Sequence, residues 1–123
     1  MPLENKETLL HEAARKVFEE ATTLSLGSPC NTVIVFHLKK KFGKDPYEVF
    51  TDDPKEFFKG LEEVFGAAAE CMVGLIGAFI VRKYEIACTA EEFVALVVKG
   101  DELSKRRLRE ILFCVASQDE KKC

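Results

Sequence analysis

The sequence lacks an apolar run long enough to cross a membrane. Its most apolar stretch, Cys71 to Val81, has eleven uncharged residues bounded by Glu70 and Arg82. A membrane helix needs roughly 20 such residues, so we expect no span. The first ten residues are polar and charged and contain no apolar export segment. Together these absences predict a cytoplasmic protein.

The cysteines lack the pattern of a secreted disulfide framework. Their number is odd, and no C-x-x-C pair occurs among them: Cys30, Cys71, Cys88, Cys114 and Cys123. Exported disulfide-rich domains have an even number of cysteines. We therefore expect the first four to be free thiols that fill small apolar spaces, as unpaired cysteines commonly do.

Side-chain amides are also scarce, with only Asn5, Asn31 and Gln118 in the chain. Few amides together with many lysines and glutamates is typical of hyperthermophile proteins, so the composition favours a thermophilic source. In such organisms an intracellular disulfide would also be compatible with this sequence. The net charge of −3 gives no general attraction to nucleic acid or anionic lipid, and binding of either would need a local patch.

Helix boundaries are clearly marked. Three prolines follow a cap residue, at Ser28-Pro29, Asp45-Pro46 and Asp53-Pro54, where proline favours the first turn of a helix. Glycines follow four apolar-periodic runs, at Gly27, Gly43, Gly66 and Gly100. We expect an all-α, single compact domain over residues 1–123, ending in a frayed tail at 117–123. Its helices are expected at about 5–23, 29–42, 46–51, 54–65, 67–84, 90–99 and 102–116.

One segment leaves an alternative open. The β-branched run Thr32–Phe36 would suit a buried strand as well as a helix. No second strand is evident to pair with it, and a lone strand is not stable. The pattern therefore favours a helix here.

The most apolar stretch lies within the helix expected at 67–84. Large apolar side chains cover most of its circumference, which is typical of a buried central helix. Small residues form a strip along the rest: Ala67, Cys71, Gly74 and Ala78. We expect another backbone to approach this strip, either a helix of the same chain or a symmetry-related copy in a homodimer. On this interpretation, Gly74→Leu would destabilise the fold by roughly 1–3 kcal/mol through overpacking.

No motif for catalysis or metal binding is complete. His11 begins a segment that resembles a zinc-protease helix, but the second ligand position is Arg15, which does not bind zinc. Cys30 and His37 would lie two turns apart on one helix, too far to share an ion. No phosphate-binding glycine loop occurs, and nothing selects a cysteine–histidine pair for nucleophilic catalysis. We therefore expect no catalytic residue, no metal site and no cofactor, and we do not expect an enzyme.

A cluster of cations is the strongest sequence signal for a binding surface. It lies on the helix expected at 102–116 and comprises Lys105, Arg106, Arg107 and Arg109. This helix follows another, an arrangement that loosely resembles a helix-turn-helix. However, two glutamates lie four residues to either side of Arg106, and no aromatic residue accompanies the cations for base stacking. The pattern favours a solvated helix face over a nucleic-acid contact.

The middle of the chain is similar to a known family. A helix ending in the sequence LKKKFG (Leu38–Gly43) is followed by an apolar pattern and then by an apolar helix. The pattern consists of Pro54, Phe57, Leu61, Val64, Phe65 and Gly66. Over residues 26–86 this resembles small archaeal helical domains of unknown function, related to segments regarded as output modules of archaeal signal-transduction proteins. The resemblance implies a helical domain from an archaeon and supplies no catalytic residues. This chain departs from the family by carrying no sensor domain and by its basic C-terminal helix.

These observations predict a non-enzymatic helical domain that works by binding a protein partner or its own copy. The resemblance suggests a role in archaeal signalling or regulation. The alternative interpretation is a nucleic-acid-binding module that uses the basic C-terminal helix. No membrane partner is expected.

Overall fold

Seven helices account for most of residues 6–122, the range that the computed structural model describes, and no strand occurs within it. The helices are α1 (Lys6–Leu26), α2 (Ser28–Phe42), α3 (Pro46–Asp52), α4 (Pro54–Phe65), α5 (Ala68–Tyr84), α6 (Ala90–Lys99) and α7 (Glu102–Lys122). The all-α fold class is thereby confirmed. α7 continues past the expected end at residue 116 because the Gln118 amide donates a hydrogen bond of 3.0 Å to the Tyr84 carbonyl at the end of α5. Cys123, the last residue of the expected tail, lies outside the described residues.

Two of the three cap residues that the sequence placed before a proline, Asp45 and Asp53, hold the starts of α3 and α4. The Asp45 carboxylate accepts a hydrogen bond of 2.9 Å from the Tyr47 N–H at the start of α3. Thr89 and Glu92 form a complete capping box at the start of α6, with two hydrogen bonds of 3.0 Å. α2 differs, because its N-cap position is Gly27 and Ser28 is already its first helical residue.

The run Thr32–Phe36 forms the middle of α2, so the strand alternative is wrong. Leu38 of the same helix is buried, and Ile34, one turn earlier, packs against the core. β-branched residues favour strands only where a neighbouring strand offers a pleated surface to pack on. The described part of the chain has no such surface.

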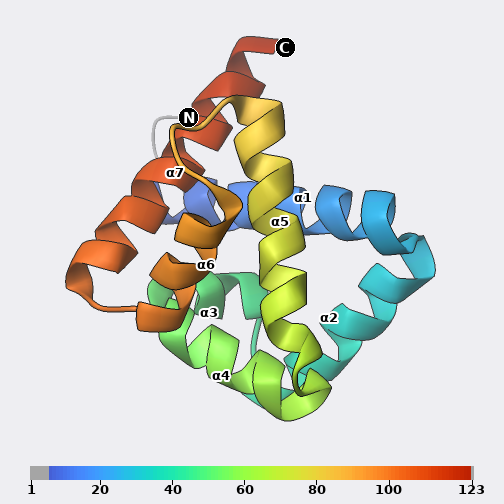
Figure 1. Cartoon of the computed structure of the whole chain (residues 1–123). Helices are drawn as coiled ribbons and strands as arrows, with labels where there is room; N and C mark the ends of the chain where they lie inside the picture. The colour runs from blue at the N-terminus through green and yellow to red at the C-terminus, as the bar shows by residue number, and fades with distance from the viewer. Residues whose placement is uncertain (1–5, 123) are drawn as a thin grey trace.

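α1 and α5 cross near the middle of the molecule, and the other helices surround them (Figure 1). α6 and α7 lie on one side of α5, α3 and α4 lie below, and α2 lies on the other side at the far end of α1. α5 contacts α1, α4, α6 and α7, but α1 also contacts four helices, so α5 is not the single centre of the domain that was expected. The corner between α1 and α2 projects away from the other helices.

A cluster of aromatic rings forms the centre of the core. Phe18 of α1 packs edge-on against Tyr47, Phe50 and Phe57, with ring centroids 5.6, 5.1 and 5.5 Å away. Phe50 also stacks on Phe93 of α6 at 6.4 Å. Each such ring contributes roughly 1.5–3 kcal/mol on full burial. α1, α3, α4 and α6 thus share one apolar centre.

α5 is buried on one side, so the expectation of a helix covered all round is wrong. The buried side consists of Ala69, Val73, Ile76, Gly77, Ile80 and Tyr84. On the other side Cys71 is exposed and Leu75 is 37% exposed. None of the helices within residues 6–122 combines the length and the apolar character of a membrane span.

The strip of small residues on α5 is not the place of closest packing. Within it, Ala67 and Cys71 are exposed, while Gly74 and Ala78 are partly buried. The atom nearest to a Cβ added at Gly74 would be Cγ2 of Val94, at 3.8 Å, which is an ordinary contact. The expected overpacking by Gly74→Leu therefore loses its basis, and the close contact with α6 occurs at Gly77 instead.

Candidate functional site

Three side chains with metal-binding atoms meet where α1 passes the end of α3. Glu7 and His11 are one turn apart on α1, and Asp52 is the last residue of α3. The His11 Nε2 atom lies 3.9 Å from Glu7 Oε1 and 3.8 Å from Asp52 Oδ1. One ligand atom from each of the three residues lies within 4.8 Å of the other two. We call Glu7, His11 and Asp52 the His11 cluster.

The apolar stripe of α1 determines where His11 lies. Leu10 and Ala14 are buried against the core, and His11 lies beside them at the edge of the stripe, with 24% of its side chain exposed. Its Nε2 atom is fully buried and has no hydrogen-bond partner within the described chain. At 3.8 and 3.9 Å the two carboxylates are too distant for hydrogen bonds. A buried polar atom without a partner is energetically costly.

Arg109 of α7 connects this cluster to a third helix. Its guanidinium forms an ion pair with the Oε2 atom of Glu7 and donates a hydrogen bond of 3.5 Å to the Thr51 carbonyl. The Arg109 side chain is 30% exposed. One guanidinium therefore contacts both α1 and the end of α3, and it holds one Glu7 oxygen while the other faces His11.

An open groove of about 780 Å³ runs along α7 beside the His11 cluster. Its charged lining combines both signs: Glu7, Asp52, Glu102, Glu110, Lys105, Arg106 and Arg109. Leu10 and Phe113 supply apolar surface. Because the carboxylates offset the cations, the groove produces no strong field for a polyanion.

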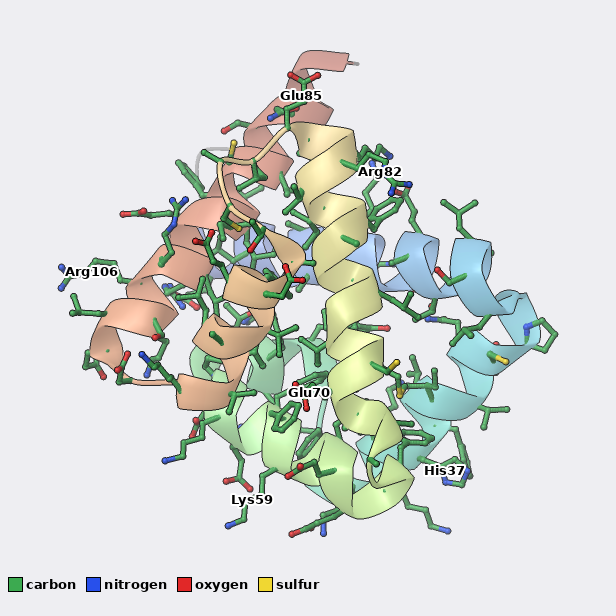
Figure 2. All side chains as sticks on the ribbon, viewed as in Figure 1. His37, Lys59, Glu70, Arg82, Glu85 and Arg106 are labelled. Atoms are coloured by element: carbon green, nitrogen blue, oxygen red, sulfur yellow. The ribbon has the colours of Figure 1, made fainter. Side chains whose placement is uncertain are left out.

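The four basic residues that the sequence singled out do not form one continuous surface. Lys105, Arg106 and Arg109 line the groove, whereas Arg107 lines a separate hollow beside α6. Lys105 and Arg107 each pair with a glutamate three residues away, at 3.8 and 3.5 Å. Arg106 extends outward from α7 (Figure 2) and has no ion pair among the described residues. Three of the four cations are therefore already engaged with carboxylates.

Large apolar side chains are exposed on α2 and at the end of α1. Val33 and Phe36 lie one turn apart on the outer side of α2 and are 51% and 59% exposed. Leu24 and Leu26, at the end of α1, are 76% and 45% exposed. We call these four residues the hairpin surface. The Nζ atom of Lys40 lies 5.7 Å from the centre of the Phe36 ring, so a cation borders this surface.

The Tyr47 hydroxyl is a second buried polar group without a hydrogen-bond partner in the described chain. Tyr47 is 5% exposed and borders a hollow that Glu19 also lines. The nearby Asn31 amide donates to the Thr22 hydroxyl at 2.8 Å. Burial, reinforced by the Glu19 carboxylate, raises the pKa of Tyr47 to about 12, and the proximity of the Asn31 amide to the phenol opposes this rise. The phenol therefore stays neutral near pH 7.

The described cysteines are free thiols, and most of them lie on the surface. Cys30, Cys71 and Cys114 are exposed, so the expectation that they fill apolar spaces is wrong for these three. Cys88 is partly buried, and this burial raises the pKa of its thiol. A raised pKa lowers the fraction of thiolate, the form that acts as a nucleophile. Cys123 lies outside the described residues.

Neither the His11 cluster nor the hairpin surface was predicted from the sequence. The zinc-protease pattern places the second metal ligand four residues after His11, at Arg15. Glu7 lies four residues before His11, on the same face of α1. The four-residue spacing of Glu7 and His11 can be recognised in the sequence. The approach of Asp52 from α3 cannot, because it depends on how the helices pack. The spacing of Val33 and Phe36 was also readable, although only the packed structure shows that this side of α2 is uncovered.

No protein-family model, no curated protein and no solved structure matches the chain. The resemblance of residues 26–86 to archaeal helical domains therefore stays a prediction from the sequence.

Proposed function

We propose that this domain is non-enzymatic and binds a protein partner through the hairpin surface. The observation that carries the proposal is the exposure of four large apolar side chains on α2 and at the end of α1, between 45% and 76%. Large exposed apolar side chains, such as Val33 and Phe36 one turn apart on α2, are typical of interaction sites. Covering it would contribute roughly 25 cal/mol for each Å² of apolar area removed from water.

The charges beside the hairpin surface favour an acidic partner segment. Lys39, Lys40 and Lys44 are exposed at the C-terminal end of α2, whereas Lys41 there is already paired with Glu63. An amphipathic acidic helix could place its apolar side on Val33 and Phe36 and its carboxylates near these lysines. A second copy of this chain fits less well. If two α2 helices paired antiparallel, the lysines of one copy would lie near residues 21–36 of the other. Those residues contain no acidic side chain.

We place this role in the cytoplasm of an archaeon, in signalling or regulation. The support for this setting is the resemblance of residues 26–86 to archaeal helical domains and the unpaired cysteines. The scarcity of side-chain amides supports a thermophilic source. Nucleic-acid binding through Lys105, Arg106, Arg107 and Arg109 remains the alternative, with weaker support because three of these cations already pair with glutamates.

The proposal is tested by affinity capture with the wild-type chain, Phe36→Ser and a control, Leu103→Ser. Leu103 is 74% exposed at the start of α7, so the control removes similar apolar area elsewhere. We expect one protein to be recovered by the wild type and the control but not by Phe36→Ser. Once purified, that protein should bind the wild type with an affinity that falls as salt rises, because the lysines contribute. Equal recovery with all three chains would overturn the proposal.

Two further measurements distinguish an acidic protein partner from a second copy of this chain and from nucleic acid. Sedimentation at several concentrations detects self-association, and a dimer that Phe36→Ser abolishes would replace the acidic partner by a second copy. Recovery of nucleic acid, and its loss on Arg106→Ala, would support the alternative function instead.

A further inference from the structure

The His11 cluster has the donor set of a transition-metal site. Imidazole nitrogen and carboxylate oxygen are both ligands of zinc and of neighbouring first-row ions. We propose that Glu7, His11 and Asp52 bind a divalent transition-metal ion, with Zn²⁺ as the representative. This site is separate from the hairpin surface and does not depend on the function proposed for it.

The distances within the cluster fit a shared ion better than direct contacts. Two ligand atoms that each lie 2.0–2.1 Å from a tetrahedral Zn²⁺ are about 3.4 Å apart. The separations of His11 Nε2 from Glu7 Oε1 and Asp52 Oδ1 are 3.9 and 3.8 Å. They exceed this spacing by a few tenths of an ångström, and the Glu7 and Asp52 ligand atoms lie within 4.8 Å of each other. Side-chain rotation that brings the two carboxylates closer would complete the site. The same separations are too long for hydrogen bonds.

Burial of the His11 Nε2 atom is an independent observation. This atom is inaccessible to solvent and has no hydrogen-bond partner within the described residues, yet it faces two carboxylates. A bound cation would satisfy the imidazole nitrogen and both carboxylate oxygens at once. The proposed ion would therefore account for the lack of a hydrogen-bond partner at the buried His11 Nε2 atom.

Arg109 acts as a positioning residue for this site. It binds the Oε2 atom of Glu7, so Oε1 remains directed toward His11. Carboxylates that bind metals are commonly held by such outer partners. The charges also favour a divalent ion, because two carboxylates outweigh the single guanidinium. Three protein ligands leave a fourth position for water or a small ligand.

Zinc titration of the cysteine-alkylated chain tests the proposal. Alkylation with iodoacetamide removes the thiols as competing ligands. We expect calorimetry to show one strong site per chain and a higher melting temperature with Zn²⁺, because the ion joins α1 to α3. His11→Gln and Asp52→Asn should each weaken binding by on the order of tenfold or more, by analogy with losses at metal-site positions. Affinity should also fall at acid pH, because the ligands must be deprotonated.

His37→Gln is the matched control, because it removes the other histidine, which is exposed on α2. It should bind Zn²⁺ as the wild type does. Co²⁺ provides a second readout through visible absorption bands of nitrogen and oxygen ligation, which Zn²⁺ should abolish by competition. Circular dichroism shows whether each variant is folded. Absence of a strong site, or equal affinity of the wild type, His11→Gln and Asp52→Asn, would overturn the proposal.

Discussion

At Gly77 the backbone of α5 lies against the Phe93 ring of α6. A Cβ at this position would be 2.8 Å from Cδ2 of Phe93 and 3.0 Å from its Cβ, closer than real Cβ contacts. A glycine inside a helix costs roughly 1 kcal/mol relative to alanine. The close packing of two core helices offsets that cost at Gly77, whereas Gly74 on the open side has no comparable contact.

We expect Gly77→Ala to lower the free energy of unfolding by roughly 1–3 kcal/mol, because α5 and α6 must move apart. Gly74→Ala is the matched control. It should leave stability unchanged or raise it by up to about 1 kcal/mol, because alanine favours the helix. Urea denaturation of both variants measures the difference. Equal effects at the two positions would show that α6 does not pack on Gly77.

Tyr47 gives a prediction for alkaline pH. In the unfolded chain the phenol ionises at its ordinary pKa of 10.0, whereas the folded chain keeps it neutral up to about 12. The raised folded pKa means that the Tyr47 contribution is complete below pH 10 and is lost as pH rises toward 12. Tyr47→Phe should therefore remove about 2 kcal/mol of the stability loss in this window. At neutral pH it should cost little, because the hydroxyl has no partner to lose.

Urea midpoints of the wild type and Tyr47→Phe, measured from neutral pH to pH 12, test this expectation. Lysines also titrate in this range, but they do so in both chains, so the difference isolates the phenol. Parallel loss of stability in the two chains would contradict a buried, neutral Tyr47.

At the scale of elements, α7 is attached to the domain by polar contacts as well as by apolar packing. Asp101 caps its start by accepting a 2.8 Å hydrogen bond from the Ser104 N–H, which lowers the pKa of Asp101. Arg109 joins its middle to α1 and α3, and Gln118 joins its last turns to the end of α5. Arg109 is thus a basic residue of α7 whose contacts hold that helix against α1 and α3.

We expect Arg109→Ala to destabilise the fold by about 1 kcal/mol, a modest value because the ion pair is partly exposed. Arg106→Ala removes the same charge from the same helix at an exposed position. It should change stability by no more than about 0.5 kcal/mol. Thermal denaturation at low and high salt compares the two. A salt-independent difference between them would argue against an ion pair at Arg109.

At the scale of the whole molecule, α1 contributes residues to both proposed sites, near its opposite ends. His11 lies in the second turn of the helix, next to α3 and α7, whereas Leu26 ends it at the projecting corner (Figure 1). At 1.5 Å per residue these positions are roughly 22 Å apart along the helix. A variant at the hairpin surface should therefore leave metal binding unchanged, and the two proposals can fail separately.

The sequence by itself determined the helices of this protein, because their boundaries depend on residues a few positions apart. The Asp45 cap and the capping box of Thr89 and Glu92 satisfy N–H groups within one turn. The apolar stripe of α1, which includes Val17 and Phe18, likewise repeats within a turn or two, and both residues are buried. Local chemistry of this kind is readable without knowledge of the fold.

Only the tertiary structure decided which helix faces are covered, because coverage depends on segments distant in the sequence. The composition of α5 suggested burial all round, but α6 covers Gly77 and leaves Cys71 exposed. Arg109 reaches Glu7 across most of the chain, and Asp52 completes the His11 cluster from a different helix. Such contacts form only after the helices have packed, since each helix can satisfy its own backbone in many arrangements and the shared apolar centre selects one.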